Sequence, residues 1–140
     1  MSEISFFVPG VPLAQGRPRA FLIKKTQRVR VYDPENSREW KAQVRWLARQ
    51  EYPGGVLTGP IRLVLMFALP RPKSLPKKIT EHTKRPDCSN LAKAVEDALR
   101  GVLYHDDSQI TWLTIIKSYV HEDGEKSPGV RITVHPQEGL

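Results

Sequence analysis

The sequence SNLAKAVEDALRG at residues 89–101 decides how the surrounding chain is interpreted. Its apolar residues recur at spacings of three and four, the period of one face of an α-helix. Ser89 or Asn90 can cap the first turn, and Gly101 can adopt the left-handed conformation that ends a helix. We therefore expect a helix with one face in the core and a polar opposite side. The apolar face holds Leu91, Ala94, Val95, Ala98 and Leu99, and the polar side holds Ser89, Lys93, Glu96, Asp97 and Arg100.

An earlier helix is expected to begin at Asp33-Pro34 and to run to about Glu51. Asp33 suits the cap position and Pro34 the first helical position, and Pro53 follows the end of the pattern. Apolar residues at helical spacing form one face of this segment. They are Trp40, Val44, Leu47 and Ala48.

Apolar and β-branched runs predict the strands. The main strands are expected at residues 4–8, 61–69, 110–120 and 130–134, with 110–120 in the centre of the sheet and a turn at Asp123-Gly124 before the last. Shorter runs at 21–23 and 29–32 predict a basic hairpin that turns within residues 24–28 and follows a loop at 11–20 rich in Pro, Gly and Arg. The order of elements favours an α+β fold in one domain over residues 1–140, with a mixed β-sheet and two main helices packed on one face.

Composition narrows the classes of protein. The chain has 140 residues, of which 39% are hydrophobic and 26% charged, as expected of a globular domain. No apolar run approaches the roughly 20 residues that span a bilayer, and the start of the chain lacks the basic region and cleavage site of a secretory signal. We therefore expect a cytoplasmic protein with no membrane partner. The single cysteine, Cys88, excludes an internal disulfide and a thiolate zinc site within one chain.

A strong positive charge points to an anionic partner such as nucleic acid. The chain carries 22 Lys and Arg against 15 Asp and Glu, a net charge of +7. Many of these residues lie in the loop and hairpin near the start, or in the Pro- and Lys-rich connector at 71–86; a solvated linker is the alternative interpretation of that connector. The candidates for DNA phosphate contacts are Arg17, Arg19, Lys24, Lys25, Lys77, Lys78, Lys84 and Arg85.

Acidic residues flank the helix at 89–101 on this basic background. Asp87 lies at the helix entrance, Lys93 one turn further on, and Asp106 and Asp107 come after the helix ends. Carboxylates are the ligands that Mg²⁺ prefers, and a lysine can orient a phosphate or stabilise charge that develops on it. Ordinary structural roles are the alternative: an Asx turn at Asp87, a surface pair of Lys93 with Asp97, and a polar turn at 106–107.

At these residues the sequence resembles the RusA family of Holliday-junction resolvases, common in bacteriophages and prophages. The family pattern Pro-Asp-x-Asp-Asn-Leu-x-Lys, Asp-Ala-Leu, Gly and Asp-Asp-x-Gln matches residues 86–93, 97–99, 101 and 106–109. The resemblance implies that Asp87 and Asp107 hold Mg²⁺, for which Mn²⁺ can substitute, that Lys93 is essential, and that Asp106 is a further candidate ligand. It also implies a homodimer that nicks two opposed strands of a four-way DNA junction in a bacterial host cell.

Ser89 departs from the family pattern, which has a second Asp at this position. Serine lacks the charge and binds a divalent metal weakly. Three outcomes follow: another carboxylate (Glu96, Asp97 or Asp106) completes the site, one metal is held in place of two, or the protein binds branched DNA and cuts it poorly. A basic RNA-binding domain is a further alternative, although no RNP aromatic pattern supports it. Exposed Trp or Tyr residues of the last strands are the suspects for the dimer surface.

Overall fold

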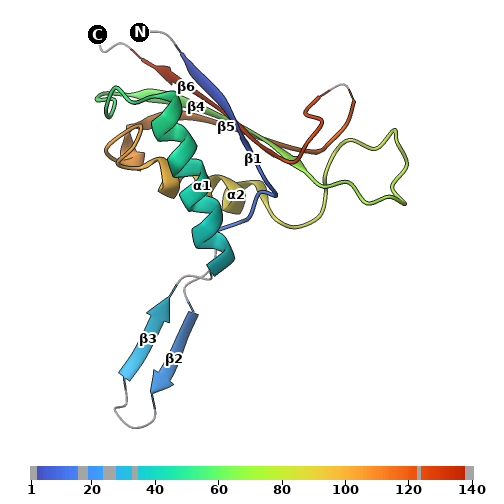
Figure 1. The fold of residues 1–140 in the computed structure, drawn as a ribbon, viewed down its shortest axis with the longest axis horizontal. Helices are drawn as coiled ribbons and strands as arrows, with labels where there is room; N and C mark the ends of the chain where they lie inside the picture. Colours follow the sequence, from blue (N-terminus) through green and yellow to red (C-terminus); the bar gives the residue numbers. More distant parts are fainter. Residues whose placement is uncertain (1–2, 16–18, 24–27, 33–34, 123, 138–140) are drawn as a thin grey trace.

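A mixed four-stranded sheet with both helices on one face forms the body of the protein (Figure 1). The structure, a computed structural model, describes residues 3–15, 19–23, 28–32, 35–122 and 124–137. The elements are β1 (Ile4–Pro9), β2 (Arg19–Ile23), β3 (Arg28–Tyr32), α1 (Glu35–Glu51), β4 (Ile61–Leu69), α2 (Cys88–Leu99), a 3₁₀ turn (Asp107–Gln109), β5 (Ile110–Tyr119) and β6 (Gly129–Pro136). The α+β fold predicted from the sequence is confirmed.

The sheet has the strand order β1-β6-β4-β5. Strand β4 pairs in parallel with β5 and antiparallel with β6, and β6 pairs antiparallel with β1. The prediction that residues 110–120 form a central strand is therefore wrong, because β5 lies at the edge of the sheet. Its apolar run suggested burial on both faces, yet Trp112, Leu113 and Ile116 are 57%, 40% and 47% exposed.

The core lies between the sheet and the two helices. On β4, Leu63, Leu65 and Phe67 are buried, whereas Arg62 and Val64, which point to the opposite face, are partly exposed. The predicted helix faces supply the other wall, because Trp40, Val44 and Ala48 of α1 and the apolar stripe of α2 are buried. Burial of each large apolar side chain stabilises the fold by about 1.5–3 kcal/mol, so this interface fixes α2 against the sheet.

Helix α2 begins two or three residues before the sequence predicted. Asp87, and neither Ser89 nor Asn90, is the cap, with extended backbone angles of φ −75° and ψ 150°. The Leu91 N–H donates to the Asp87 carbonyl at 3.0 Å and so closes the first turn. The predicted end is confirmed, since α2 stops at Leu99 and Gly101 has a φ of +81°.

Strand β2 begins at Arg19, so the expectation of irregular structure up to residue 20 is wrong by two residues. Residues 19 and 20 pair with Tyr32 and Val31 of β3, which extends the expected hairpin arms. The predicted cap at residues 33 and 34, positions 24–27 of the predicted 24–28 turn, and position 123 of the predicted 123–124 turn lie outside the described residues, while Arg28 already belongs to β3. No helix in the described part of the chain is long and apolar enough to cross a membrane.

Candidate functional site

Asp87 lies at the entrance of α2 with an exposed side chain. Its carbonyl takes part in the first helical turn, but its carboxylate makes no capping hydrogen bond to α2. An N-cap aspartate ordinarily bonds the N–H of the second or third helical residue. The carboxylate is therefore available to a ligand while the backbone at Asp87 is held in place.

Lys117 of β5 anchors the segment that leads into Asp87. Its ammonium donates to the Lys84 carbonyl at 2.6 Å and to the Pro86 carbonyl at 2.8 Å. Hydrogen bonds from a charged donor are about twice as strong as neutral ones. This contact ties the start of α2 to the last third of β5.

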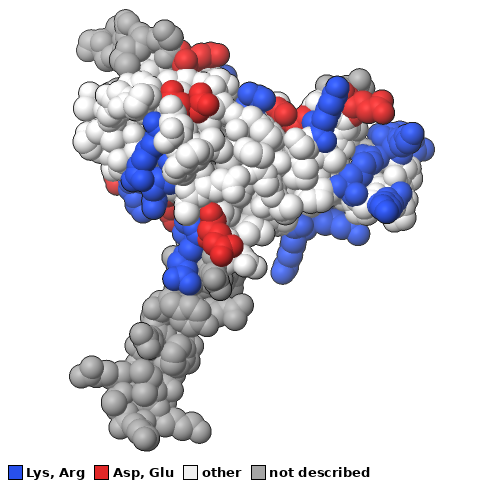
Figure 2. Space-filling view, viewed as in Figure 1, with Lys and Arg blue, Asp and Glu red and all other residues white. Residues whose placement is uncertain are grey.

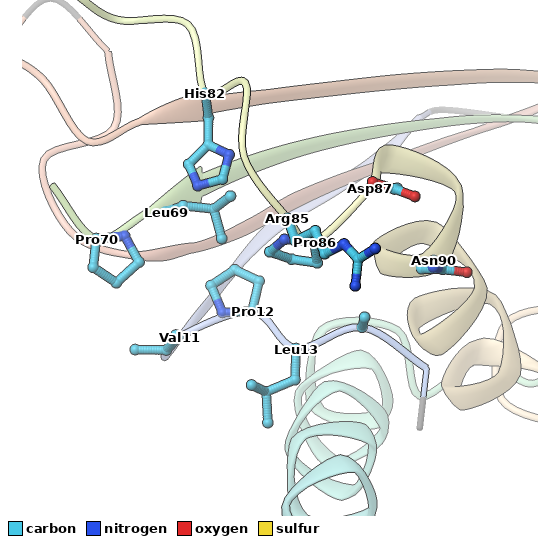
Figure 3. Close-up of a pocket in the computed structure, with 11 residues that line it drawn as sticks. Val11, Pro12, Leu13, Leu69, Pro70, His82, Arg85, Pro86, Asp87 and Asn90 are labelled. Atoms are coloured by element: carbon cyan, nitrogen blue, oxygen red, sulfur yellow. The ribbon is translucent and has the colours of Figure 1, made fainter. Parts of the chain in front are cut away.

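A hollow of about 830 Å³ lies beside this entrance. Figure 3 shows Asp87 and Asn90 on the first turn of α2 at one side, and Leu69, Pro70 and His82 at the other. The ring of His82 lies 4.6 Å from that of Tyr119, and burial, followed by the positive charge of Lys117, lowers the pKa of His82. The hollow thus combines the Asp87 carboxyl group with a histidine whose pKa is lowered.

Asp107 lies near the opposite end of α2. Its Oδ2 is 3.7 Å from the Arg100 guanidinium, whereas its Oδ1 is buried without a hydrogen-bond partner among the described residues. A buried carboxylate oxygen without a partner is costly unless a cation or a water molecule satisfies it. Asp107 therefore retains one unused ligand atom.

Glu96 interacts electrostatically with both Asp107 and Lys93. Burial, and next the negative charge of Asp107, raise the pKa of the Glu96 carboxyl, while Lys93 opposes the effect. Tyr104 is buried below, and its hydroxyl donates to the Glu96 carbonyl at 2.8 Å. Burial raises the pKa of Tyr104 far above its usual range, with Asp107 and Glu96 adding to the shift, so Tyr104 acts as a neutral donor.

Asp106 caps the 3₁₀ turn that carries Asp107. Its Oδ2 accepts from the Ser108 N–H at 3.0 Å. The Ser108 side chain, and next this backbone N–H, lower the pKa of Asp106 by hydrogen bonding to its carboxylate. In return, the Gln109 side chain accepts from the Asp106 N–H at 3.0 Å and donates to the Leu57 and Gly59 carbonyls, each at 2.9 Å. This capping box fixes Asp107 at the start of β5.

Asp97, a candidate replacement for the family's missing carboxylate, is engaged elsewhere. Its carboxylate is 3.8 Å from the Lys41 ammonium of α1 and 3.5 Å from the Arg100 guanidinium. The surface pair with Lys93 that the sequence offered as an alternative is not among the ion pairs of the described residues. Arg45 of α1 adds hydrogen bonds to the Ala98 and Asp97 carbonyls, so basic side chains surround this end of α2.

The structure separates the predicted acidic residues into two places. Asp87 precedes α2, whereas Asp107 contacts Arg100 just after it. Glu96 follows Asp87 by nine residues, which corresponds to about 13 Å along a helix axis. Within the described residues, no group of three or more His, Cys, Asp or Glu side chains could hold a metal ion.

A divalent metal therefore fits the donor chemistry but not the geometry of one chain. The free carboxylate of Asp87 and the unpartnered Oδ1 of Asp107 are the hard oxygen ligands that Mg²⁺ prefers. Because the two aspartates are separated along α2, each has too few neighbouring carboxylates to complete a metal site within one chain. Ser89 adds no charge at the entrance of α2. No reaction step can be derived from a metal site within a single chain.

Predicted DNA-contacting residues are exposed wherever their side chains are described. Lys77, Lys78, Lys84 and Arg85 are exposed on the connector between β4 and α2. Figure 2 shows Lys and Arg gathered over the projecting lobe that this connector forms on the right of the view. The side chains of Arg17, Arg19, Lys24 and Lys25 lie outside the described part of the chain.

Three basic residues with structural roles were not identified from the sequence. Lys117 anchors the segment before α2, Arg100 pairs with Asp107, and Arg71 shapes the connector. The Arg71 guanidinium donates to the Ile79 and Pro76 carbonyls and so shapes the connector. The signal for Lys117 was available, because a lysine between Ile116 and Tyr119 in an apolar strand requires polar partners when its side chain points toward the helices.

Comparison with known proteins agrees with the motif. A family model described as "Endodeoxyribonuclease RusA" matches residues 9–135. The chain is also 36% identical over 132 residues to a Bacillus subtilis (strain 168) protein described as "Uncharacterized protein YqaN", covering 87% of this chain and 92% of that protein.

Proposed function

Because the chain belongs to the RusA endodeoxyribonuclease family, we propose that it is a divalent-metal-dependent endonuclease that resolves Holliday junctions by paired symmetric nicks. The observation that carries the proposal is the family match over residues 9–135, which includes the whole motif from Asp87 to Gln109. We further propose Mg²⁺ as the natural ion, with Mn²⁺ as a substitute. The protein would act as a homodimer in DNA recombination and repair, in the cytoplasm of a bacterial host and with a phage or prophage origin.

Asp87 and Asp107 are the proposed metal-holding residues, with Asp106 supporting Asp107 through its capping box. A bound Mg²⁺ would polarise the scissile phosphate and lower the pKa of a water molecule. Lys93 is exposed on the polar side of α2, where its ammonium can orient a phosphate and stabilise developing negative charge.

Basic side chains would bind the DNA backbone without reading its sequence. The proposed contacts are Lys77, Lys78, Lys84 and Arg85 on the connector, with Arg17, Arg19, Lys24 and Lys25 of the hairpin region. Each phosphate that such residues neutralise adds about 0.9 to the slope of log affinity against log salt. Binding should therefore weaken steeply with salt for every junction sequence.

The test is cleavage of a labelled four-way junction in Mg²⁺, Mn²⁺ or EDTA. Wild type should nick two opposed strands in either metal and none in EDTA, while Asp87→Asn should bind the junction without nicking it. Glu51→Gln is the matched control, because Glu51 is an exposed acid at the far end of α1 and should cut at the wild-type rate. Junction binding without nicking by wild type in both metals would contradict the enzymatic proposal.

That contradicting result would favour the second candidate, a branched-DNA-binding protein with weakened catalysis. Ser89 is the specific observation behind it, since a carboxylate of the family pattern is missing at an exposed position in the first turn of α2. Equal affinity for duplex RNA and junction DNA would instead support a basic RNA-binding domain.

A further inference from the structure

The outer edge of β5 carries unpaired backbone groups. Among the described residues, β4 is the only strand that pairs with β5. The Tyr119 N–H donates to the Thr80 carbonyl at 2.8 Å on the side away from β4. Since backbone groups alternate along a regular strand, those of Leu113 and Ile115 point to that same edge, whereas a register shift against β4 interrupts the alternation at Thr111. No described residue outside the sheet accepts or supplies a hydrogen bond to them.

Exposed apolar side chains flank this open edge. Trp112 and Ile116 are 57% and 47% exposed, and they share the uncovered face of the sheet with Met66 of β4. Leu113 is 40% exposed on the side of the helices. Long apolar edges of this kind are sites of strand pairing, and soluble proteins usually block them with charge, proline or a covering segment.

The chain itself covers only the last part of the edge. Glu81 bridges Ser118, and the Thr80 carbonyl bonds Tyr119. The open, regularly paired segment is therefore residues 112–116, in which Leu113 and Ile115 face outward. A strand with such a short open segment pairs most completely with an antiparallel copy of itself, because a twofold axis matches each free N–H to a free carbonyl.

We propose that two copies pair their β5 strands antiparallel about a twofold axis near Leu113, and that each metal site combines Asp87 of one copy with Asp107 of the other. The inference rests on the proposed nuclease function and deepens it. The family resemblance implies that Asp87 and Asp107 share a metal site, although they lie apart in one chain. Pairing of two copies accounts for both.

Strand direction is what brings the two acids together. Asp107 immediately precedes β5, whereas Lys117 ties the Asp87 segment to its last third through the Pro86 carbonyl at 2.8 Å. Antiparallel pairing about Leu113 places Gln109 of one copy opposite Lys117 of the other. The turn that carries Asp107 then faces the segment that carries Asp87 of the second copy, twice per dimer.

Pairing also accounts for the exposed side chains. In this register Ile116 of one copy lies opposite Ile110 of the other, and Trp112 lies opposite Thr114 on the same face. Trp112 is held on this face by the Arg62 guanidinium, 4.2 Å from its ring centre. The two sheets would join into one of eight strands, with all four helices on the same side.

The interface is tested by a cross-link that needs no nuclease activity. In a Cys88→Ser background, Leu113→Cys should form a disulfide-linked dimer on mild oxidation, because directly opposed strand residues lie within disulfide reach. Met66→Cys is the matched control, since Met66 is 41% exposed but lies on β4 away from the edge. Equal cross-linking of the two variants would overturn the pairing.

Subunit complementation tests the shared site. Asp87→Asn and Asp107→Asn should each be inactive alone, but after chain exchange every mixed dimer has one site with both aspartates. An equal mixture should recover about a quarter of the wild-type nicking, as single nicks, since about half of the dimers are mixed and one of their two sites is intact. No recovery beside an active wild type would show that both aspartates act within one chain, which overturns this inference and leaves the proposed function standing.

If wild type does not cut junctions, the proposed function fails. The shared site is then tested by cross-linking, which measures whether residue 87 of one chain lies near residue 107 of the other. Asp87→Cys and Asp107→Cys chains of different tag length, both with Cys88→Ser, would be mixed and treated with a short bis-maleimide. A mixed cross-linked species in excess of Asp107→Cys homodimers supports the shared site. Its absence overturns it.

Discussion

Replacing Lys117 with methionine should release the segment that carries Asp87. Methionine keeps most of the apolar stem but removes the ammonium that donates to the Lys84 and Pro86 carbonyls at 2.6 and 2.8 Å. Because hydrogen bonds to charged groups are worth about 1.5–3 kcal/mol each and water can replace them at this partly exposed site, we expect about 2 kcal/mol in total.

Most of this cost should appear as local opening. The core contacts of α2 do not involve Lys117, so the free energy of global unfolding should fall by about 1 kcal/mol or less. A local loss of about 1.4 kcal/mol raises the ratio of open to closed forms tenfold. Since nicking follows the closed population, the rate of junction nicking in Lys117→Met should fall, by at most about tenfold, if Asp87 must be held in place.

Hydrogen exchange reads the opening directly. The Leu91 N–H donates to the Asp87 carbonyl at 3.0 Å and should exchange faster in Lys117→Met, while the buried Val95 amide in the middle of α2 stays protected. Lys117→Arg is the control, because it keeps a charged donor and should recover most of both readouts. Unchanged Leu91 protection together with wild-type nicking would refute the anchoring role.

Four further substitutions test the neighbouring contacts. Ser89→Asp should raise nicking in Mg²⁺ and stabilise α2 by about 0.3–1 kcal/mol through the helix dipole, read from cleavage and urea titration; slower nicking would contradict a missing carboxylate. The pKa of Glu96 is raised in the folded protein, so ionisation of Glu96 destabilises the fold. This destabilisation is absent below the unfolded pKa of 4.5 and grows as pH rises toward the folded pKa. The free energy of unfolding of Glu96→Gln, measured by urea titration, should therefore increase relative to that of wild type between pH 4 and pH 7. A difference that does not change with pH would contradict this prediction. Tyr104→Phe should cost about 1–2 kcal/mol by leaving the buried Glu96 carbonyl unpaired, which thermal unfolding should report as a lower Tm. Gly101→Ala should cost about 1 kcal/mol in urea titration because φ is +81°, with no steric clash to add, since nothing lies within 4 Å of the new methyl.

Local periodicity predicted the helices well because each buries one face. Val44 and Val95 sit where a 3.6-residue period requires, and Gly101 ends α2 as its backbone freedom allows. The start of α2 was misplaced by two or three residues because Asp87, Ser89 and Asn90 are all capable caps. The choice depended on the backbone of Asp87, which Pro86 and the Lys117 contact fix.

Sheet order could not be obtained in the same way. The run from Ile110 to Tyr119 has the composition of a buried strand, and composition does not say which strands lie beside it. Its place at the edge follows from β6 pairing with both β1 and β4, contacts that are remote in sequence. The same remoteness hid Arg100 as the partner of Asp107.

Helix direction explains why the acidic motif is compact in sequence yet divided in space. Helix α2 carries the chain away from Asp87, and the 3₁₀ turn then starts β5 at the far end, with Asp107 beside Glu96 and Arg100. A replacement for the family's missing aspartate must therefore lie near Asp87, where neither Glu96 nor Asp97 can reach within one chain. In the proposed dimer, antiparallel pairing of β5 brings the family's other acidic residue, Asp107 of the second copy, to this place, while no carboxylate takes the position of Ser89. On this reasoning the loss at Ser89 weakens each site by one ligand but does not abolish it, which is why Ser89→Asp should accelerate cutting and not merely permit it.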